Sequence, residues 1–168
     1  IFDEIYFSTA LRACQTMETI CHILDFRGPK RGSKDLGEQS QGDWDGKRRI
    51  EVYTPEILEE MREKHSDFSA PNGESIFETG DRKYNFIEKN LMRREKNLVV
   101  GIFGHGMATK AFVANVLESN PQMTYRISID NCSITHLKYS SEQPHQGWSL
   151  VKLNDTSHLF DVGFVPNV

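Results

Sequence analysis

Apolar and polar positions follow two periods along the chain, and each period predicts a different kind of element. The first residues, Ile1–Phe7, combine aromatic and β-branched side chains and predict a short strand. Apolar side chains then recur every three to four residues over Ala10–Leu24, which predicts an amphipathic helix that begins behind the hydroxyls of Ser8 and Thr9. Leu98–Phe103 is an unbroken apolar run, typical of a buried strand in a parallel sheet.

The middle of the chain predicts three further helices. A capping hydroxyl followed by proline, Thr54-Pro55, begins the first of them. Glu74 begins a second stretch that extends to Glu95, and the apolar residues on its inward side are Ile76, Phe77, Ile87 and Leu91. The third helix, Met107–Ser119, ends at Asn120-Pro121, because the residue before a proline is disfavoured in a helix.

The segments that remain are predicted strands or loops. Asp25–Gly46 carries five glycines, one proline and two serines, and we expect a long loop there. Strands are predicted after the last helix at Arg126–Asp130, Ser133–Tyr139 and Trp148–Leu153. Strands and helices that alternate around a buried central strand predict an α/β fold, here one domain over residues 1–160 with a tail at 161–168.

Composition narrows the class of protein. The chain has 168 residues, 26% of them charged, and a net charge of -4, as in an ordinary globular domain. The acidic balance argues against nucleic-acid binding, which needs a basic face, and no apolar run approaches the ~18 residues of a membrane span. Three cysteines without a CxxC motif fit a reduced, cytoplasmic protein. No cluster has metal-ligand spacing, so neither a metal nor another cofactor is expected.

The turn Gly104-His105-Gly106 is the most informative chemical feature. It follows the buried strand and opens a helix, where free backbone N–H groups and the helix dipole favour an anion. Glycine lets the backbone approach a ligand, and His105 adds a hydrogen bond or a proton. Two alternatives stay open: a turn residue without function, and a dinucleotide site in an oxidoreductase. In that site Asp130 would bind the ribose, although Thr109 replaces the third glycine of the motif.

Two more residues are candidates for phosphate chemistry. Arg12 lies in the first turns of the helix after the first strand, and a guanidinium suits bidentate phosphate recognition. Glu74 lies in the segment Pro71–Ser75, near a helix start that stabilises a carboxylate. Burial beside a bound phosphate would instead raise the pKa of Glu74 and fit it for proton donation. Taken singly, each residue is more often an ordinary solvated or first-turn residue.

These features occur in one order, and together they resemble the histidine phosphatase superfamily, the phosphoglycerate-mutase-like proteins. The order is S-T-x-L-R-A-x-Q-T from Ser8, L-G-E-x-x-x-G-D-W-D-G over Leu36–Gly46, P-N-G-E-S from Pro71, and then G-H-G. The last third of the chain is similar to the closing strands of the family at Asn131–Thr135 and Trp148–Leu159. The resemblance implies a doubly wound, mostly parallel sheet with helices on both faces.

The resemblance also implies a metal-free, two-step phosphoryl transfer through a phosphohistidine. By position, Arg12 is one of two phosphate-binding arginines, His105 is the second histidine and Gly106 also contacts the phosphate, while Glu74 is the acid that protonates the leaving oxygen. The family's Arg-His-Gly motif, which supplies the nucleophile and the other arginine on a central strand, occurs nowhere in this sequence.

The expected protein is therefore part of a phosphomonoesterase that acts on a phosphorylated small molecule. The chain begins at Ile1 rather than Met, and we expect a preceding segment with the missing central strand. Without it the chain itself is expected to be inactive. A phosphoglycerate-mutase-type transferase and a noncatalytic phosphate-binding pseudo-enzyme are the alternatives. Neither the substrate nor the oligomeric state follows from the sequence.

Overall fold

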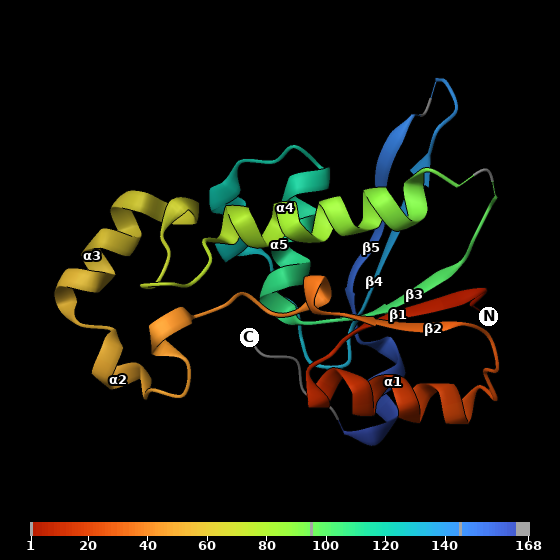
Figure 1. Ribbon diagram of the computed structural model, residues 1–168, viewed down its shortest axis with the longest axis horizontal. Coiled ribbons are helices and arrows are strands. Elements are labelled where there is room, and N and C mark those ends of the chain that lie inside the picture. Colours follow the sequence, from red (N-terminus) through yellow and green to blue (C-terminus); the bar gives the residue numbers. More distant parts are fainter. Residues whose placement is uncertain (1, 95, 145, 164–168) are drawn as a thin grey trace.

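A computed structural model describes residues 2–94, 96–144 and 146–163, which form an α/β structure with two separate sheets (Figure 1). The larger sheet is parallel and has the order β2-β1-β3. Its strands are β1 (Glu4–Ser8), β2 (Lys30–Ser33) and β3 (Val100–Phe103). The smaller sheet is the antiparallel hairpin of β4 (Ile134–Ser140) and β5 (Gly147–Asp155).

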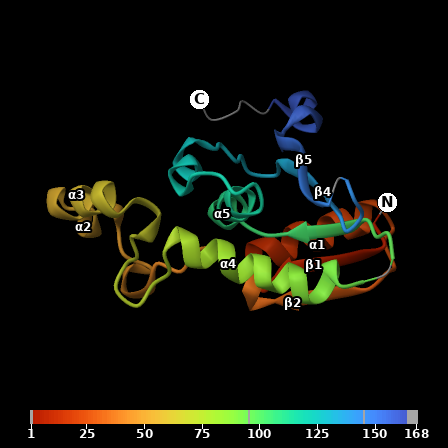
Figure 2. The ribbon, with the colours of Figure 1, turned by 90° about the horizontal axis from the view of Figure 1, so that it is seen from above.

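One edge of β3 is open in the described part of the chain. β3 pairs with β1 on one side, and no strand of residues 2–94, 96–144 or 146–163 pairs with it on the other. Figure 2 shows the β4–β5 hairpin beyond that second edge. The hairpin therefore lies on the side of β3 without forming backbone pairs with it.

The register of the parallel sheet brings two segments that are distant in sequence to the same level. Phe7 of β1 lies opposite Phe103 of β3, so both strands end at one edge of the sheet. Ser8 is the last residue of β1, and the turn with His105 follows directly after β3. This edge carries the candidate site.

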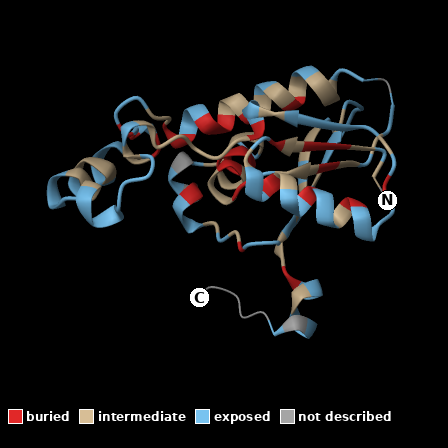
Figure 3. Ribbon diagram, turned by 60° about the horizontal axis from the view of Figure 1, so that its bottom comes forward, coloured by how far each residue is buried: buried red, intermediate tan, exposed pale blue. Residues whose placement is uncertain are grey.

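Helices cover both faces of the larger sheet (Figures 1 and 2). On one face, α1 (Leu11–Ile23) contributes Met17 and Cys21 to a core with Ile5 and Phe26. On the other face, α4 (Ile76–Ile87) packs Phe86 edge-on against Tyr6 of β1, with ring centroids 5.6 Å apart. The helix α5 (Gly106–Val116) packs against α4, and Figure 3 shows buried residues concentrated in these strands and helices. The predicted α/β fold with helices on both faces is confirmed.

A largely exposed pair of helices extends away from this body at the left of Figure 1. They are α2 (Arg49–Val52) and α3 (Pro55–Lys64), and the side chain of Thr54 caps α3 by accepting from the N–H of Ile57. Trp44 packs at their base, with its ring 5.7 Å from that of Tyr53. The remaining short helical turns are Lys34–Leu36, Gly42–Trp44, His65–Asp67, Glu88–Met92, Pro121–Arg126 and Ser157–Val162.

Two of the predicted loop and strand assignments are wrong. The predicted loop Asp25–Gly46 contains β2, a polar and exposed edge strand whose four residues show no apolar alternation. The predicted strand Arg126–Asp130 is absent, because a 3-10 turn ends at Arg126 and residues 127–130 belong to no strand. A segment becomes a strand only where another strand pairs with it: β2 pairs with β1, whereas residues 127–130 pair with no described strand.

The helix predicted over Glu74–Glu95 differs from the expectation in its first residue and in which of its side chains are buried. Ser75, rather than Glu74, caps α4, in a reciprocal box with Glu78. Ile76 and Ile87 are buried as predicted, but Phe77 is 52% exposed and Lys83 is buried in the same helix. Residues 1, 95 and 164–168, which include parts of the predicted first strand, the end of this helix and the tail, lie outside the described residues.

Among the described residues, no helix is long and apolar enough to cross a membrane. The three cysteines, Cys14, Cys21 and Cys132, are free thiols.

Candidate active site

His105 lies at the carboxyl edge of the sheet and contacts residues from two other elements. Nε of Arg12, on α1, donates to Nδ1 of the imidazole at 3.2 Å. Nε2 of the imidazole lies 2.8 Å from Oγ of Ser8, at the end of β1. Since a guanidinium can only donate, Nδ1 carries no proton, and the neutral ring donates from Nε2 to Ser8. The structure therefore brings two of the predicted residues, Arg12 and His105, into direct contact.

The surroundings of His105 keep its ring neutral. Burial lowers the pKa of His105 below its ordinary value, and the positive charge of Arg12 lowers it further. At neutral pH the ring thus presents an N–H donor of fixed direction without a charge. This tautomer also prevents His105 from acting as a base toward Ser8, because Nε2 already holds the proton.

Glu38 occupies the start of the helix that follows His105. Its carboxylate accepts from the backbone N–H of Met107 at 3.2 Å and of Ala108 at 2.8 Å. These are free donors of the first turn of α5, so a protein carboxylate already binds part of the expected anion site. Gly106, the predicted phosphate contact, is the first residue of α5 and lies directly beside these donors.

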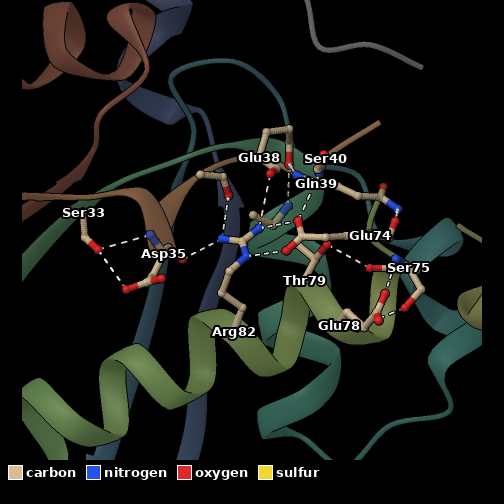
Figure 4. Close-up of polar contacts among 12 residues, drawn as sticks. Ser33, Asp35, Glu38, Gln39, Ser40, Glu74, Ser75, Glu78, Thr79 and Arg82 are labelled. Carbon is tan, nitrogen blue, oxygen red and sulfur yellow. Dashed lines mark hydrogen bonds and ion pairs between the residues drawn. The ribbon is translucent and has the colours of Figure 1, made fainter. Parts of the chain in front are cut away.

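Glu74 is bound by a different set of groups, shown in Figure 4. Nε and Nη2 of Arg82 donate to its two carboxylate oxygens at 2.6 and 2.8 Å, and the N–H of Ser40 donates at 3.1 Å. The Arg82 hydrogen bonds hold the pKa of Glu74 below its ordinary value, against the opposing effect of burial. In this state Glu74 is an ionised carboxylate at neutral pH, and a raised pKa beside a bound phosphate stays a prediction.

Arg82 connects Glu74 to the segment that carries Glu38. Besides the carboxylate, its guanidinium donates to the carbonyl oxygens of Asp35 at 2.7 Å and Glu38 at 3.2 Å. In Figure 4 the Arg82 side chain rises from α4 between this loop and Glu74. Glu74 is therefore linked to the turn of His105 through Arg82 and Glu38, rather than by a hydrogen bond of its own.

Sequence reasoning missed Ser8, Glu38 and Arg82 of this network. It also missed Lys83, which follows Arg82 on α4 and donates to Oγ1 of Thr109 on α5. Ser8 and Glu38 lie inside the motifs quoted above, so their positions were available as a signal. Arg82 and Lys83 lie on α4, where charged residues near the middle of an amphipathic helix are indistinguishable from solvated ones until the packing is known.

Two other sequence expectations concern metals and dinucleotides. Among the residues that the structure describes, no group of three or more His, Cys, Asp or Glu side chains is placed to hold a metal ion. Asp130, the predicted ribose ligand, does not end a strand, and its carboxylate accepts from Nδ2 of Asn154 at 2.8 Å. The dinucleotide interpretation needs Asp130 at the end of a strand, and the structure does not place it there.

Comparison with known proteins identifies relatives of this chain. The sequence profile of the histidine phosphatase superfamily (branch 1) matches residues 1–156. "Probable phosphoglycerate mutase GpmB" of Serratia proteamaculans (strain 568) is 32% identical over 119 residues, which cover 67% of this chain and 54% of that protein. The chain thus spans about half the length of this curated relative.

Solved structures share the fold at lower identity. Bacillus stearothermophilus YhfR is 20% identical, with a TM-score of 0.78 over 94% of this chain and 76% of that one. Phosphoserine phosphatase from Entamoeba histolytica, solved in complex with 3-phosphoglyceric acid, is 21% identical, with a TM-score of 0.76 over 94% and 76% of the two chains. These likenesses support the fold and carry no information on substrate.

Replacing Arg12 by Gln should raise the pKa of His105, because a neighbouring positive charge is removed. NMR titration of the imidazole measures this shift. The unfolded chain takes up this proton near pH 6.5, whereas the folded chain resists it, so wild-type stability falls as the pH drops below about 6.5. That acid loss should be smaller in Arg12→Gln. The exposed Arg27→Gln is the matched control, and an unchanged pKa of His105 would contradict the Arg12 contact.

Proposed function

The chain belongs to the histidine phosphatase superfamily, and we propose that it is part of a phosphomonoesterase acting on a phosphorylated small molecule through a phosphohistidine. The observation that carries this proposal is the contact of Arg12 with a neutral His105 at the carboxyl edge of the sheet. Fixed donors aimed at the equatorial oxygens are what a phosphoryl-transfer transition state requires. The proposed reaction uses no metal ion.

Arg12 has donors to spare for a phosphoryl group. It is exposed and uses Nε on His105, and within the described residues its two Nη groups have no hydrogen-bond partner. Two Nη donors are the fork that binds a phosphate bidentately. We propose that these donors, with Nε2–H of His105 redirected from Ser8 and the backbone at Gly106, bind the phosphoryl oxygens.

Glu74 is the proposed acid for the leaving oxygen. Its ionised state, held by Arg82, means that it must take up a proton before it can donate one. A phosphate dianion bound nearby raises the pKa of a carboxyl group, since the two negative charges repel. Substrate binding is thus proposed to supply both the phosphoryl group and the condition under which Glu74 becomes protonated.

The nucleophile is proposed to lie on an Arg-His-Gly segment outside these 168 residues. The sequence contains no such motif, and the chain spans 54% of its curated relative. The open edge of β3, with the β4–β5 hairpin beyond it, supports insertion of one more strand there. We call this chain joined to that segment the completed protein.

A reducing compartment such as the cytoplasm fits the three free thiols of the chain.

A mutase is the second candidate, because the curated relative is named as a probable phosphoglycerate mutase. The two functions differ in the fate of the phosphoryl group. Incubating the completed protein with 3-phosphoglycerate separates them: release of inorganic phosphate supports the phosphatase, whereas formation of 2-phosphoglycerate without release supports the mutase.

His105→Ala in the completed protein should lower kcat/KM by roughly 10²-fold or more, the cost of one preorganised transition-state donor. Steady-state hydrolysis of several phosphomonoesters measures this loss. His136→Ala, an exposed histidine on β4, should leave turnover unchanged and serves as the control. Near wild-type turnover of the His105 variant would refute its assignment to the phosphate site.

Glu74→Gln should harm substrates with poor leaving groups most. A sugar alkoxide needs a proton as it departs, whereas p-nitrophenolate hardly does, so loss of an acid spares the second substrate. Rates with a sugar phosphate and with p-nitrophenyl phosphate are compared in the completed protein. Equal losses on both would show that Glu74 serves its Arg82 ion pair rather than proton transfer.

The 168-residue chain alone should have no phosphatase activity and should be unstable. A missing central strand removes several apolar side chains worth ~1.5–3 kcal/mol each, from a domain whose net stability is ~5–15 kcal/mol. The open edge of β3 is also a template for aggregation. Thermal melting and an assay with p-nitrophenyl phosphate test both points. A cooperative melt with turnover would show that the nucleophile lies within this chain.

If the completed protein is equally inactive but still binds phosphate, the result would instead identify a noncatalytic phosphate-binding protein.

A further inference from the structure

Lys83 is a charged residue at a core position. It lies seven residues after Ile76 and four before Ile87, on the inward face of α4, and is 5% exposed. Burying an ammonium group is costly unless neighbouring groups compensate for the lost water. An apolar side chain would suit this position better for stability alone, so the lysine calls for another explanation.

The ammonium group of Lys83 lies behind the turn that carries His105. Nζ donates to Oγ1 of Thr109 on α5 at 3.3 Å and lies 5.5 Å from the ring centroid of Phe112 on the same helix. A Cβ built on Gly104 would come within 3.8 Å of Nζ. The charge therefore lies close to Gly104, the residue before His105, and contacts the helix after it.

Three charged or titratable groups face this ammonium. The carboxylate of Glu38, which caps the first turn of α5, attracts it; Arg82, the preceding residue of α4, repels it; and the charge of Lys83 itself disfavours protonation of His105. Burial lowers the pKa of Lys83 from 10.5 to about 8, and Glu38 opposes that shift. Lys83 and Glu38 thus both bind the first residues of α5, Lys83 through Oγ1 of Thr109 and Glu38 through the N–H groups of Met107 and Ala108.

We propose that Lys83 is a positioning residue of the phosphate site: its ammonium group, balanced by Glu38, holds the Gly104–Gly106 turn and the first turn of α5 so that His105 faces Arg12. The buried charge also adds positive potential behind the bound phosphate. The predicted effect of Lys83 on phosphate binding rests on the proposed phosphatase function. The effect of Lys83 on the pKa of His105 can be measured separately.

The position of Lys83 makes phosphate affinity and protein stability change in opposite directions with pH. Above about pH 8 the folded protein loses the lysine proton and its positive charge, so phosphate binding weakens. Between about pH 8 and 10.5 the unfolded chain still binds that proton, so stability rises. A lysine with only a structural role would not couple phosphate affinity to this titration.

The test compares Lys83→Met with Lys89→Met in the completed protein. Lys89 is exposed and lies in the turn Glu88–Met92 that directly follows α4. Inorganic phosphate is the probe, with affinity measured by calorimetry from pH 6.5 to 9.5. Lys83→Met should weaken binding at pH 7 roughly tenfold, the effect of one buried charge at an effective dielectric constant of about 20. The variant should also lack the wild-type decline above pH 8, while Lys89→Met should behave as wild type.

Two further measurements guard against a loss of phosphate binding that is caused only by misfolding of Lys83→Met. NMR titration should show a higher pKa of His105 in Lys83→Met, because a nearby positive charge is gone. Thr109→Val, which removes the hydrogen-bond acceptor of Nζ but keeps the charge, should move the alkaline decline of phosphate affinity to lower pH.

The outcomes separate this inference from the function on which it rests. Unchanged phosphate affinity together with an unchanged pKa of His105 in Lys83→Met would overturn the positioning role while leaving the phosphatase proposal standing. If the wild-type protein binds no phosphate at any pH, the proposed function fails, and the His105 titration alone then decides whether Lys83 acts on the turn.

Discussion

The candidate site depends on the parallel pairing of β1 with β3. Their register sets Phe7 opposite Phe103, so the strands end together and Ser8 meets the ring of His105. The helix that follows β1 then presents Arg12 one turn beyond Ser8, where its guanidinium reaches the other ring nitrogen. A slip of one residue would turn alternate side chains to the opposite face and separate these three groups.

Charged residues behind the site support it at a cost in stability. Arg82 hydrogen-bonds Glu74 and three backbone carbonyls, and Glu38 accepts from the first turn of α5. Lys83 is compensated by the hydroxyl of Thr109 and the charge of Glu38. Each group is acceptable inside the protein only because the next one is present. These interactions hold backbone and side-chain donors in place, which is the preorganisation that the proposed phosphoryl transfer requires.

The two carboxylates near the site have different environments and therefore different uses. The carboxylate of Glu38 accepts hydrogen bonds from the backbone N–H groups of Met107 and Ala108 at the start of α5. Glu74 is held by a guanidinium that could change partners when a phosphate arrives, because an arginine binds either anion. The chain belongs to the histidine phosphatase superfamily, and no strand of the described residues pairs with the second edge of β3. Both observations support the proposal that these residues form one part of a larger active centre.

Local sequence patterns determined the elements whose signals are complete within a few residues. The cap at Thr54, the apolar run of β3 and the turn Gly104-His105-Gly106 were all predictable, because capping, burial on both faces and helix entry are properties of short segments. Arg12 and His105 were also predictable as candidates, although their contact spans two helices and two strands.

Only the tertiary structure decided which polar residues are buried and what they contact. β2 is a strand because β1 offers its backbone as a partner, not because its residues favour strands. Glu74 is ionised because Arg82 reaches it from α4, and Lys83 is buried because α5 covers that face of the helix. The charge state of a side chain depends on the neighbours and solvent around it, and these are set by packing between segments that are distant in sequence.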